Sequence, residues 1–296
     1  MSTAVPAGIA SLETPVYRRR RRMNKAMITL SFIALVFGLF WLLWILGVLL
    51  WFGGEALRPV LFTQMTPPPG ASGGLANAIL GSVLMAGFGT LIGTPIGILA
   101  GTYLAEYGGR GWLAPATRFI NDVLLSAPSI VIGLFIYTIY VARVKHFSAW
   151  AGALALAIIV VPVVVRTTDD MLKLVPNSLR EAAVALGCPS WKMITMISYR
   201  AARAGIVTGI LLAIARISGE TAPLLFTAFV FNYWSTDLRQ PMSSVTMQMY
   251  TYAISPYEDL HRQAWAGALV LVSTVLLCSI LARVATRRLA RMTVGE

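Results

Sequence analysis

Residues 177–197, NSLREAAVALGCPSWKMITMI, lie in a polar segment between two long apolar runs and carry the capping and turn residues of a helical hairpin. Asn177 or Ser178 can cap a helix, because short polar side chains accept hydrogen bonds from the free N–H groups at its start. Glu181 follows Ser178 by three residues, which is the spacing of a capping box. Gly187 suits the end of this helix. The stretch therefore predicts a short capped helix, a tight turn and a second helix.

The composition indicates a membrane protein. Hydrophobic residues make up 57% of the 296 residues and charged residues only 12%, whereas soluble proteins carry about 25% charged residues. The net charge of +12 comes from basic residues that flank apolar runs, which the positive-inside rule explains without nucleic-acid binding. The sequence predicts an integral membrane protein in contact with the lipid bilayer, with no nucleic-acid partner.

Six apolar segments are long enough to cross a bilayer, which takes about 20 residues. When the N-terminus is placed inside, most Lys and Arg residues, including the run Arg18–Arg22, fall on the cytoplasmic side. The positive-inside rule thus predicts that both termini are cytoplasmic, although Arg143 and Lys145 on a short outer loop oppose it. The predicted spans are Met27–Phe52, Leu75–Ala105, Phe119–Val141, Ala149–Val165, Ala204–Phe231 and Ala264–Val284.

Two charged residues interrupt the fifth apolar run, within the stretch RISGETAPLL (residues 216–225). A rise of about 1.5 Å per residue places Arg216 roughly 18 Å from Ala204, near the middle of a bilayer core of about 30 Å. An arginine at that depth costs about 3 kcal/mol, so we expect a function for it in an anion path. Helical geometry predicts one narrow stripe that consists of Gly209, Arg216, Glu220, Pro223 and Thr227. We expect this stripe to face protein or a water-filled path rather than lipid, with Arg216, Glu220 and Thr227 as candidate residues of a substrate path.

Simpler interpretations of the charged residues stay open. Arg216 and Glu220 are four residues apart and can neutralise each other, which would lock this helix to a neighbour without any solute. Arg166, at the end of the fourth span, can extend to lipid headgroups, as arginines at helix ends usually do. We favour the headgroup interpretation for Arg166 and keep it as a secondary candidate contact for an anion.

The sequence lacks the patterns of a catalytic or nucleotide-binding protein. There is no G-x-x-x-x-G-K-[ST] loop, and Ser218 has no histidine near it in sequence to act as a base. The two cysteines and two histidines are isolated from one another, so no metal-binding spacing is present. We expect a non-enzymatic chain that binds no metal and no cofactor of its own.

The hairpin sequence resembles the EAA signature of permease subunits of ABC importers. In that family the signature is EAA, three residues, Gly, nine residues and Ile, although Tyr199-Arg200 stands here where the family usually has Leu-Pro. The resemblance implies a coupling helix that docks on a cytoplasmic ATPase. An ordinary helical hairpin at the membrane surface remains the alternative from spacing alone. The matching residues are Glu181, Ala182, Ala183, Gly187 and Ile197.

Longer blocks, including GTPIGILAGTYLAEYG and ILLAIARISGETAPLLF, resemble the phosphate-specific ABC permeases of the PstA type over residues 67–285. The resemblance implies an all-α, six-helix type I ABC-importer permease in the bacterial cytoplasmic membrane. It also implies three partners: a second, PstC-like permease, a PstB-like ATPase dimer that uses ATP, and a periplasmic PstS-like phosphate-binding protein. The predicted organisation is a basic cytoplasmic tail (1–26), a first transmembrane helix (27–52), a periplasmic loop (53–74), a permease core (75–285) with a coupling loop (167–203), and a cytoplasmic tail (286–296).

Two other functions stay open at this point. The same machinery could carry sulfate, molybdate or a phosphonate, because the residues by themselves indicate only an anion. A proton-coupled secondary transporter could use Arg216 and Glu220 as its coupled pair, but such transporters often have two related halves, which this sequence lacks. Dependence of uptake on ATP or on the proton gradient would distinguish the two mechanisms.

Overall fold

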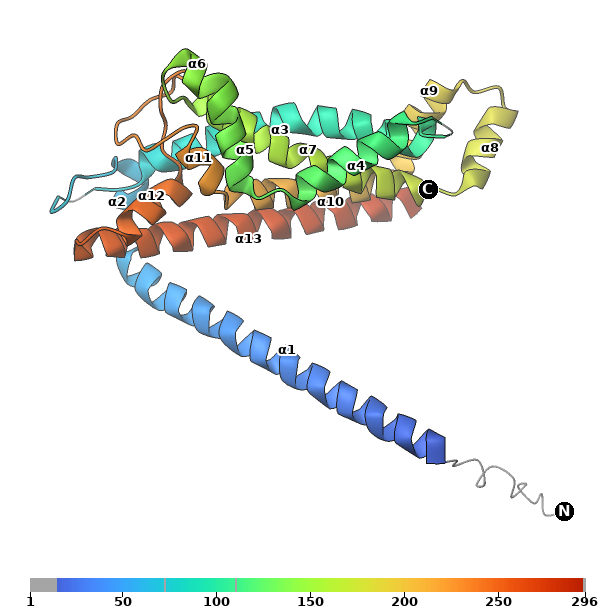
Figure 1. Ribbon diagram of the computed structural model, residues 1–296, viewed down its shortest axis with the longest axis horizontal. Helices are drawn as coiled ribbons and strands as arrows, with labels where there is room; N and C mark the ends of the chain where they lie inside the picture. Colours follow the sequence, from blue (N-terminus) through green and yellow to red (C-terminus); the bar gives the residue numbers. More distant parts are fainter. Residues whose placement is uncertain (1–14, 72, 110, 295–296) are drawn as a thin grey trace. The chain divides into compact units, whose positions relative to one another are not determined.

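The computed structural model describes residues 15–71, 73–109 and 111–294, which form helices, turns and loops with no strand among them. The prediction of an all-α chain is confirmed (Figure 1). Residues 1–14 and 295–296 of the two predicted tails lie outside the described residues. The helices are α1 (Pro15–Ala56), α2 (Val60–Thr63), α3 (Ala76–Thr102), η1 (Tyr103–Tyr107), α4 (Leu113–Ser126), α5 (Ser129–Ile136), η2 (Tyr137–Val141), α6 (Ala142–Val144), α7 (Ala149–Lys173), α8 (Asn177–Ala185), α9 (Ser190–Met193), η3 (Ile194–Ser198), α10 (Tyr199–Ser218), α11 (Ala222–Leu225), α12 (Val245–Ala253) and α13 (Glu258–Val294).

The chain divides into two compact units, residues 1–51 and 52–296. The described part of the first unit is a single helix, because α1 continues without a break from Pro15 through the Arg18–Arg22 run. The predicted first span, Met27–Phe52, lies inside this helix, and the predicted tail is therefore helical from Pro15 onward. The second unit contains all the other helices and is called the bundle below.

Within the described residues, five helices are long and apolar enough to cross a membrane, and a bent pair brings the number to six. The bent pair replaces the predicted third span, Phe119–Val141, because the chain turns by 103° between α4 and α5. Ala127 is extended there (ψ 132°) and Pro128 follows it. Proline disfavours helical backbone at the preceding residue and lacks the N–H that would continue the helix. The predicted third span is therefore present as a broken span, and it completes the six predicted spans.

Helix α7 forms the centre of the bundle and packs along its length against α3. Glycines recur every fourth residue on the contacting face of α3, which lets the two backbones approach closely. A Cβ added at Gly97 would lie only 2.6 Å from the Cβ of Val164. These contacts make α3 and α7 one closely fitted pair. The contacts in order are Gly89 with Leu156, Gly93 with Val160, Gly97 with Val164, and Gly101 with Thr168.

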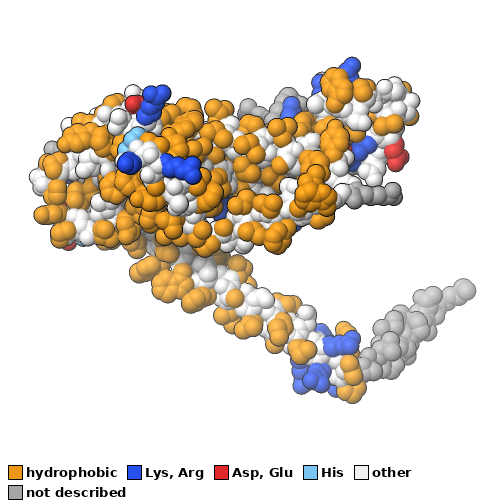
Figure 2. Space-filling model, turned by 45° about the horizontal axis from the view of Figure 1, so that its top comes forward, with side chains coloured by type: hydrophobic (Ala, Val, Ile, Leu, Met, Phe, Trp, Pro, Cys, Tyr) orange, Lys and Arg blue, Asp and Glu red, His pale blue; other side chains and the backbone are white. Residues whose placement is uncertain are grey.

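The remaining helices define two ends of the bundle. Figure 1 shows α8 and α9 at one end, which we call the α8 end, and α2, α6 and α12 at the opposite end. Between these ends, α10 packs along α7, and α13 packs against α10 and α12. Figure 2 shows that hydrophobic side chains cover most of the visible face of the bundle, as a lipid-facing surface requires.

Candidate functional site

The segment that contains Arg216 is broken rather than continuous. The helix begins at Ser190 and ends at Ser218, so the predicted span Ala204–Phe231 is wrong at both ends. The chain turns at Gly219 and starts the short helix α11, in which Pro223 occupies the first turn. Proline has no N–H, and its ring excludes the carbonyl four residues earlier, so α10 cannot continue through it. The predicted single stripe therefore does not exist as one helical face.

Arg216 lies in the last turn of α10, where the negative end of the helix dipole favours a positive charge. Its Nε lies 4.0 Å from Oε1 of Glu220, and the side chains are 40% and 16% exposed, respectively. That separation is too long for a hydrogen bond. The Glu220 carbonyl accepts a 2.9 Å hydrogen bond from the Thr246 hydroxyl, which ties the break to the start of α12. The pair is loose, and the guanidinium can still donate to an anion.

Arg166 and Thr227 differ sharply in their surroundings. Thr227 is fully buried at 0% exposure, and its hydroxyl donates a 2.8 Å hydrogen bond to the Pro223 carbonyl. It stabilises the turn after α11 and is buried in this conformation, and its place on a path stays a prediction. Arg166 is 59% exposed and pairs with Asp170 at 3.1 Å and with Asp122 of α4 at 3.7 Å. Arg166 thus stays on an accessible surface of the bundle.

The structure does not gather the two predicted arginines into one cluster. Gly209 of α10 packs against Thr167, the neighbour of Arg166. Arg216 follows Gly209 by seven residues, a rise of about 10 Å along α10. Each arginine also has its own carboxylate partners. The two side chains therefore suit successive positions along a surface rather than a single binding site.

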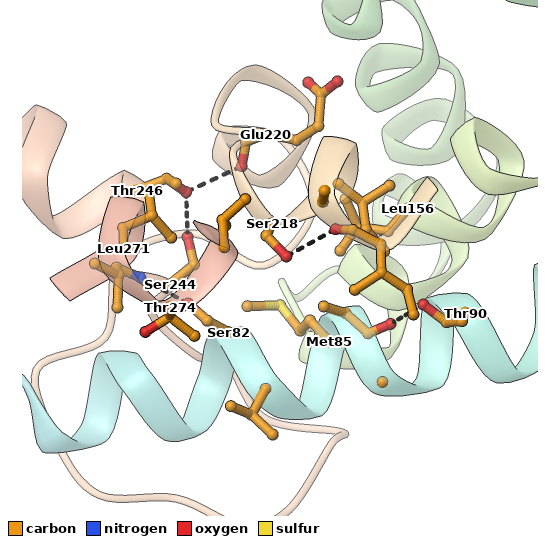
Figure 3. A pocket seen from close by; sticks show the side chains of 18 of the residues that line it. Ser82, Met85, Thr90, Leu156, Ser218, Glu220, Ser244, Thr246, Leu271 and Thr274 are labelled. Carbon is orange, nitrogen blue, oxygen red and sulfur yellow. Dashed lines mark hydrogen bonds between the residues drawn. The ribbon is translucent and has the colours of Figure 1, made fainter. Parts of the chain in front are cut away.

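A cavity of about 470 Å³ lies between α3, α10, α12 and α13, next to the break (Figure 3). The hydroxyls of Thr90 and Ser218 donate to carbonyls of their own helices, and that of Thr246 donates to the Glu220 carbonyl. Figure 3 shows the Glu220 carboxylate directed away from the other labelled side chains. The cavity is therefore poorly suited to an anion. Its apolar lining includes Met85, Leu156, Ile217, Leu224, Val270 and Leu271.

The α8 hairpin has the predicted end but not the predicted start. Gly187 adopts a φ of 75°, and its N–H bonds to the Val184 carbonyl while the Cys188 N–H bonds to Ala183. This pair of bonds is a Schellman motif, which explains the glycine. At the start, Pro176 takes the N-cap position and makes no side-chain cap. The predicted capping box is wrong, because Asn177 is already helical and accepts a hydrogen bond from Arg180 instead.

The hairpin buries one side and exposes the other. Ala183 packs with Met193 and Ile194 in a small apolar cluster that fixes α8 against α9 and η3. Glu181, Ala182 and Gly187 are exposed. Apolar side chains are exposed beside them, namely Leu186 at 89%, Trp191 at 61% and Val184 at 59%. Exposed apolar side chains gathered at one end of a molecule are typical of a protein-binding surface.

One ion pair at the α8 end was missed by sequence reasoning. Arg180 donates to both carboxylate oxygens of Glu106 in η1, at 2.9 and 3.2 Å, with the side chains only 17% and 6% exposed. The two residues are 74 positions apart, so no local pattern pointed to the pair. The burial of two opposite charges at the end of a helical span is the feature that identifies it in the structure.

Comparison with known proteins identifies the family. Residues 93–293 match the family described as "Binding-protein-dependent transport system inner membrane component". The "Phosphate transport system permease protein PstA" of Pasteurella multocida is 63% identical over 90% of this chain and 95% of its own. The protein of the same name from Yersinia pestis is 58% identical over 90% of each chain. The chain belongs to the PstA family of permeases.

Solved structures agree with the family at the level of the fold. A chain of the inward-facing MetNI methionine ABC transporter superposes with a TM-score of 0.58, at 18% identity, over 72% of this chain and 93% of its own. A chain of an amino acid ABC transporter, crystallised with histidines, gives 0.54 at 17% identity, over 71% and 92% of the two chains. The PstA-family chain therefore has the predicted type I fold of ABC-importer permeases, and it is a multi-pass membrane protein.

Proposed function

We propose that this chain is a permease subunit of an ATP-driven phosphate importer in the bacterial cytoplasmic membrane. The observation that carries the proposal is the identity of 57–63% to three chains named phosphate transport permeases. The chain spans at least 90% of the length of each of them, so a shared function of the whole subunit is reasonable. The chain itself performs no catalysis, and ATP is hydrolysed by a partner.

The exposed part of the α8 hairpin is the proposed docking surface for a cytoplasmic ATPase dimer. Glu181 and Ala182 are accessible, Ala183 fixes α8 against α9, and Gly187 closes the helix. Leu186, at 89% exposure, is the apolar group most available to a cleft on the partner. Docking here would put the α8 end on the cytoplasmic side. The distribution of Lys and Arg supports the same side for both termini.

Arg216 is the proposed phosphate contact. Its planar guanidinium carries a permanent charge and suits bidentate recognition of oxyanions. Glu220, 4.0 Å away, would lower the affinity of Arg216 for phosphate. A moderate affinity suits a transport site, which must release its cargo. Arg166 would act at a later position of the same path. A homologous second permease would complete the path, and a periplasmic phosphate-binding protein would deliver phosphate to the opposite end of the bundle.

ATP-driven uptake tests this function. Vesicles that contain the complete transporter should accumulate phosphate when supplied with ATP and the binding protein, and should not accumulate sulfate. Uptake that follows the proton gradient without ATP would contradict the proposal and favour a secondary transporter. Preference for sulfate, molybdate or a phosphonate would retain the machinery and reassign the substrate.

A further inference from the structure

The guanidinium of Arg180 has every one of its donors engaged. Arginine carries five N–H groups. Nε and Nη2 bond to the two carboxylate oxygens of Glu106, Nη2 also donates to the Leu172 carbonyl at 2.7 Å, and Nη1 donates to the Val175 carbonyl at 2.6 Å and to Asn177 at 3.2 Å. This side chain therefore holds α8, the end of α7 and the end of α3 in one fixed arrangement.

The position of this pair matters because α8 projects from the bundle. Figure 1 shows α8 beyond the ends of α4 and α7. Its apolar contacts are made with α9 and η3 in the same hairpin. The chain joins α8 to α7 through residues 174–176 and to α9 through residues 186–189. Arg180, in the middle of α8, supplies a third attachment, and it reaches a different helical span through Glu106.

The third attachment provides a route by which a displacement of α8 can reach another helix of the bundle. The chain connections and the contacts of Ala183 attach α8 to α7 and to its own hairpin. The rigid bidentate pair with Glu106 attaches it to the end of α3 as well, so a push on α8 reaches α3 directly. The glycine contacts between α3 and α7 then carry the displacement into the centre of the bundle.

We propose that the Arg180–Glu106 pair is a positioning link that transmits movement of α8 to the α3–α7 pair during transport. This inference rests on the proposed function of α8 as the docking helix. The pair touches neither phosphate nor nucleotide. Its loss should therefore leave ATP hydrolysis running while transport fails, a result that a merely structural contact would not give.

The test measures phosphate imported per ATP hydrolysed by the complete transporter in vesicles. Glu106→Gln removes the charge and one strong acceptor, and Arg180→Lys keeps the charge but loses the planar fork. We expect each variant to assemble and to hydrolyse ATP within about twofold of the wild-type rate. The amount of phosphate imported per ATP should fall about tenfold, which is within the usual range of coupling between two sites. Glu258→Gln and Arg262→Lys make the same chemical changes at exposed positions of α13 and should leave the ratio unchanged.

A double variant separates a linked pair from two independent residues. If the pair acts as one unit, Glu106→Gln/Arg180→Lys should lower the ratio no more than the more severe single variant. Three results would each overturn the link. The losses of the two single variants could multiply in the double variant, the ratio could be unchanged in both single variants, or both single variants could fail to assemble. If the wild type carries another anion, the proposed substrate fails, and the same ratio measured with that anion still tests the link.

Discussion

Two Arg–Glu pairs in this molecule have the same chemistry and opposite surroundings. At the α8 end, Arg180 and Glu106 make a bidentate contact with 17% and 6% of their side chains exposed. At the break after α10, Arg216 and Glu220 are 4.0 Å apart, and 40% of the arginine is exposed. The first arginine has all its donors engaged within the chain, and the second does not. Burial and geometry, rather than residue type, underlie the different roles that we propose for the two pairs.

The largest expected effect belongs to the buried pair. Arg180→Ala leaves the Glu106 carboxylate buried without its partner, and breaking such a pair destabilises by about 3–5 kcal/mol. We expect this loss locally, as faster hydrogen exchange of α8 amides in the assembled transporter. Arg262→Ala, at an exposed arginine, is the control. Unchanged hydrogen exchange in α8 would show that the Arg180–Glu106 pair does not stabilise this helix, and the contrast between the two pairs would fail.

The next effect concerns the loose pair. Arg216→Gln removes a charge-assisted hydrogen bond worth about 2 kcal/mol, or roughly thirtyfold in affinity for an anion. Phosphate uptake should fall accordingly, with assembly and α8 exchange unchanged. Recovery in Arg216→Gln/Glu220→Gln would mean that the glutamate only neutralises the arginine, and the phosphate contact would then lie elsewhere. Failure of Arg216→Gln to assemble would make this pair structural too.

A smaller effect should follow at the end of α8. Gly187 has a φ of 75°, and a side chain in left-handed backbone costs about 1–2 kcal/mol. Gly187→Ala should therefore shift the hairpin and lower phosphate uptake more than ATP hydrolysis. Gly54→Ala is a matched control, because a Cβ there meets no atom within 4 Å. Equal uptake by both variants would show that transport does not depend on this turn.

The smallest effect should come from Glu220→Gln. The arginine of this pair is 40% exposed, and the 4.0 Å separation is longer than a hydrogen bond. Such a loosely held pair contributes about 0–1 kcal/mol. Thermal unfolding of the assembled transporter should therefore change little, while uptake continues. A loss of stability as large as that expected for Arg180→Ala would erase the contrast between the two pairs.

The sequence by itself determined the features that depend on neighbouring residues. Runs of about 20 apolar residues predict helices that cross a bilayer, and the predicted spans Met27–Phe52, Ala149–Val165 and Ala264–Val284 each lie within a single helix. Gly187 ends α8 as predicted, because the restriction on φ is a property of one residue. The RISGETAPLL stretch indicated charges in an apolar setting. Pro223 is also a sequence signal for a helix break, and the structure has a break there in place of the predicted continuous span.

Only the tertiary structure decided which distant residues meet. The pairing of Arg180 with Glu106 joins positions 74 residues apart, and it exists because α3 packs against α7 and brings their ends to α8. Thr227 is completely buried, which its neighbours in sequence do not indicate. Pro128 in the sequence indicates a break but not its size, so the angle of 103° between α4 and α5 is likewise known only from the structure. Local sequence indicates where apolar helices lie and where a glycine or proline can end them, whereas burial and partnership depend on the sum of contacts between helices.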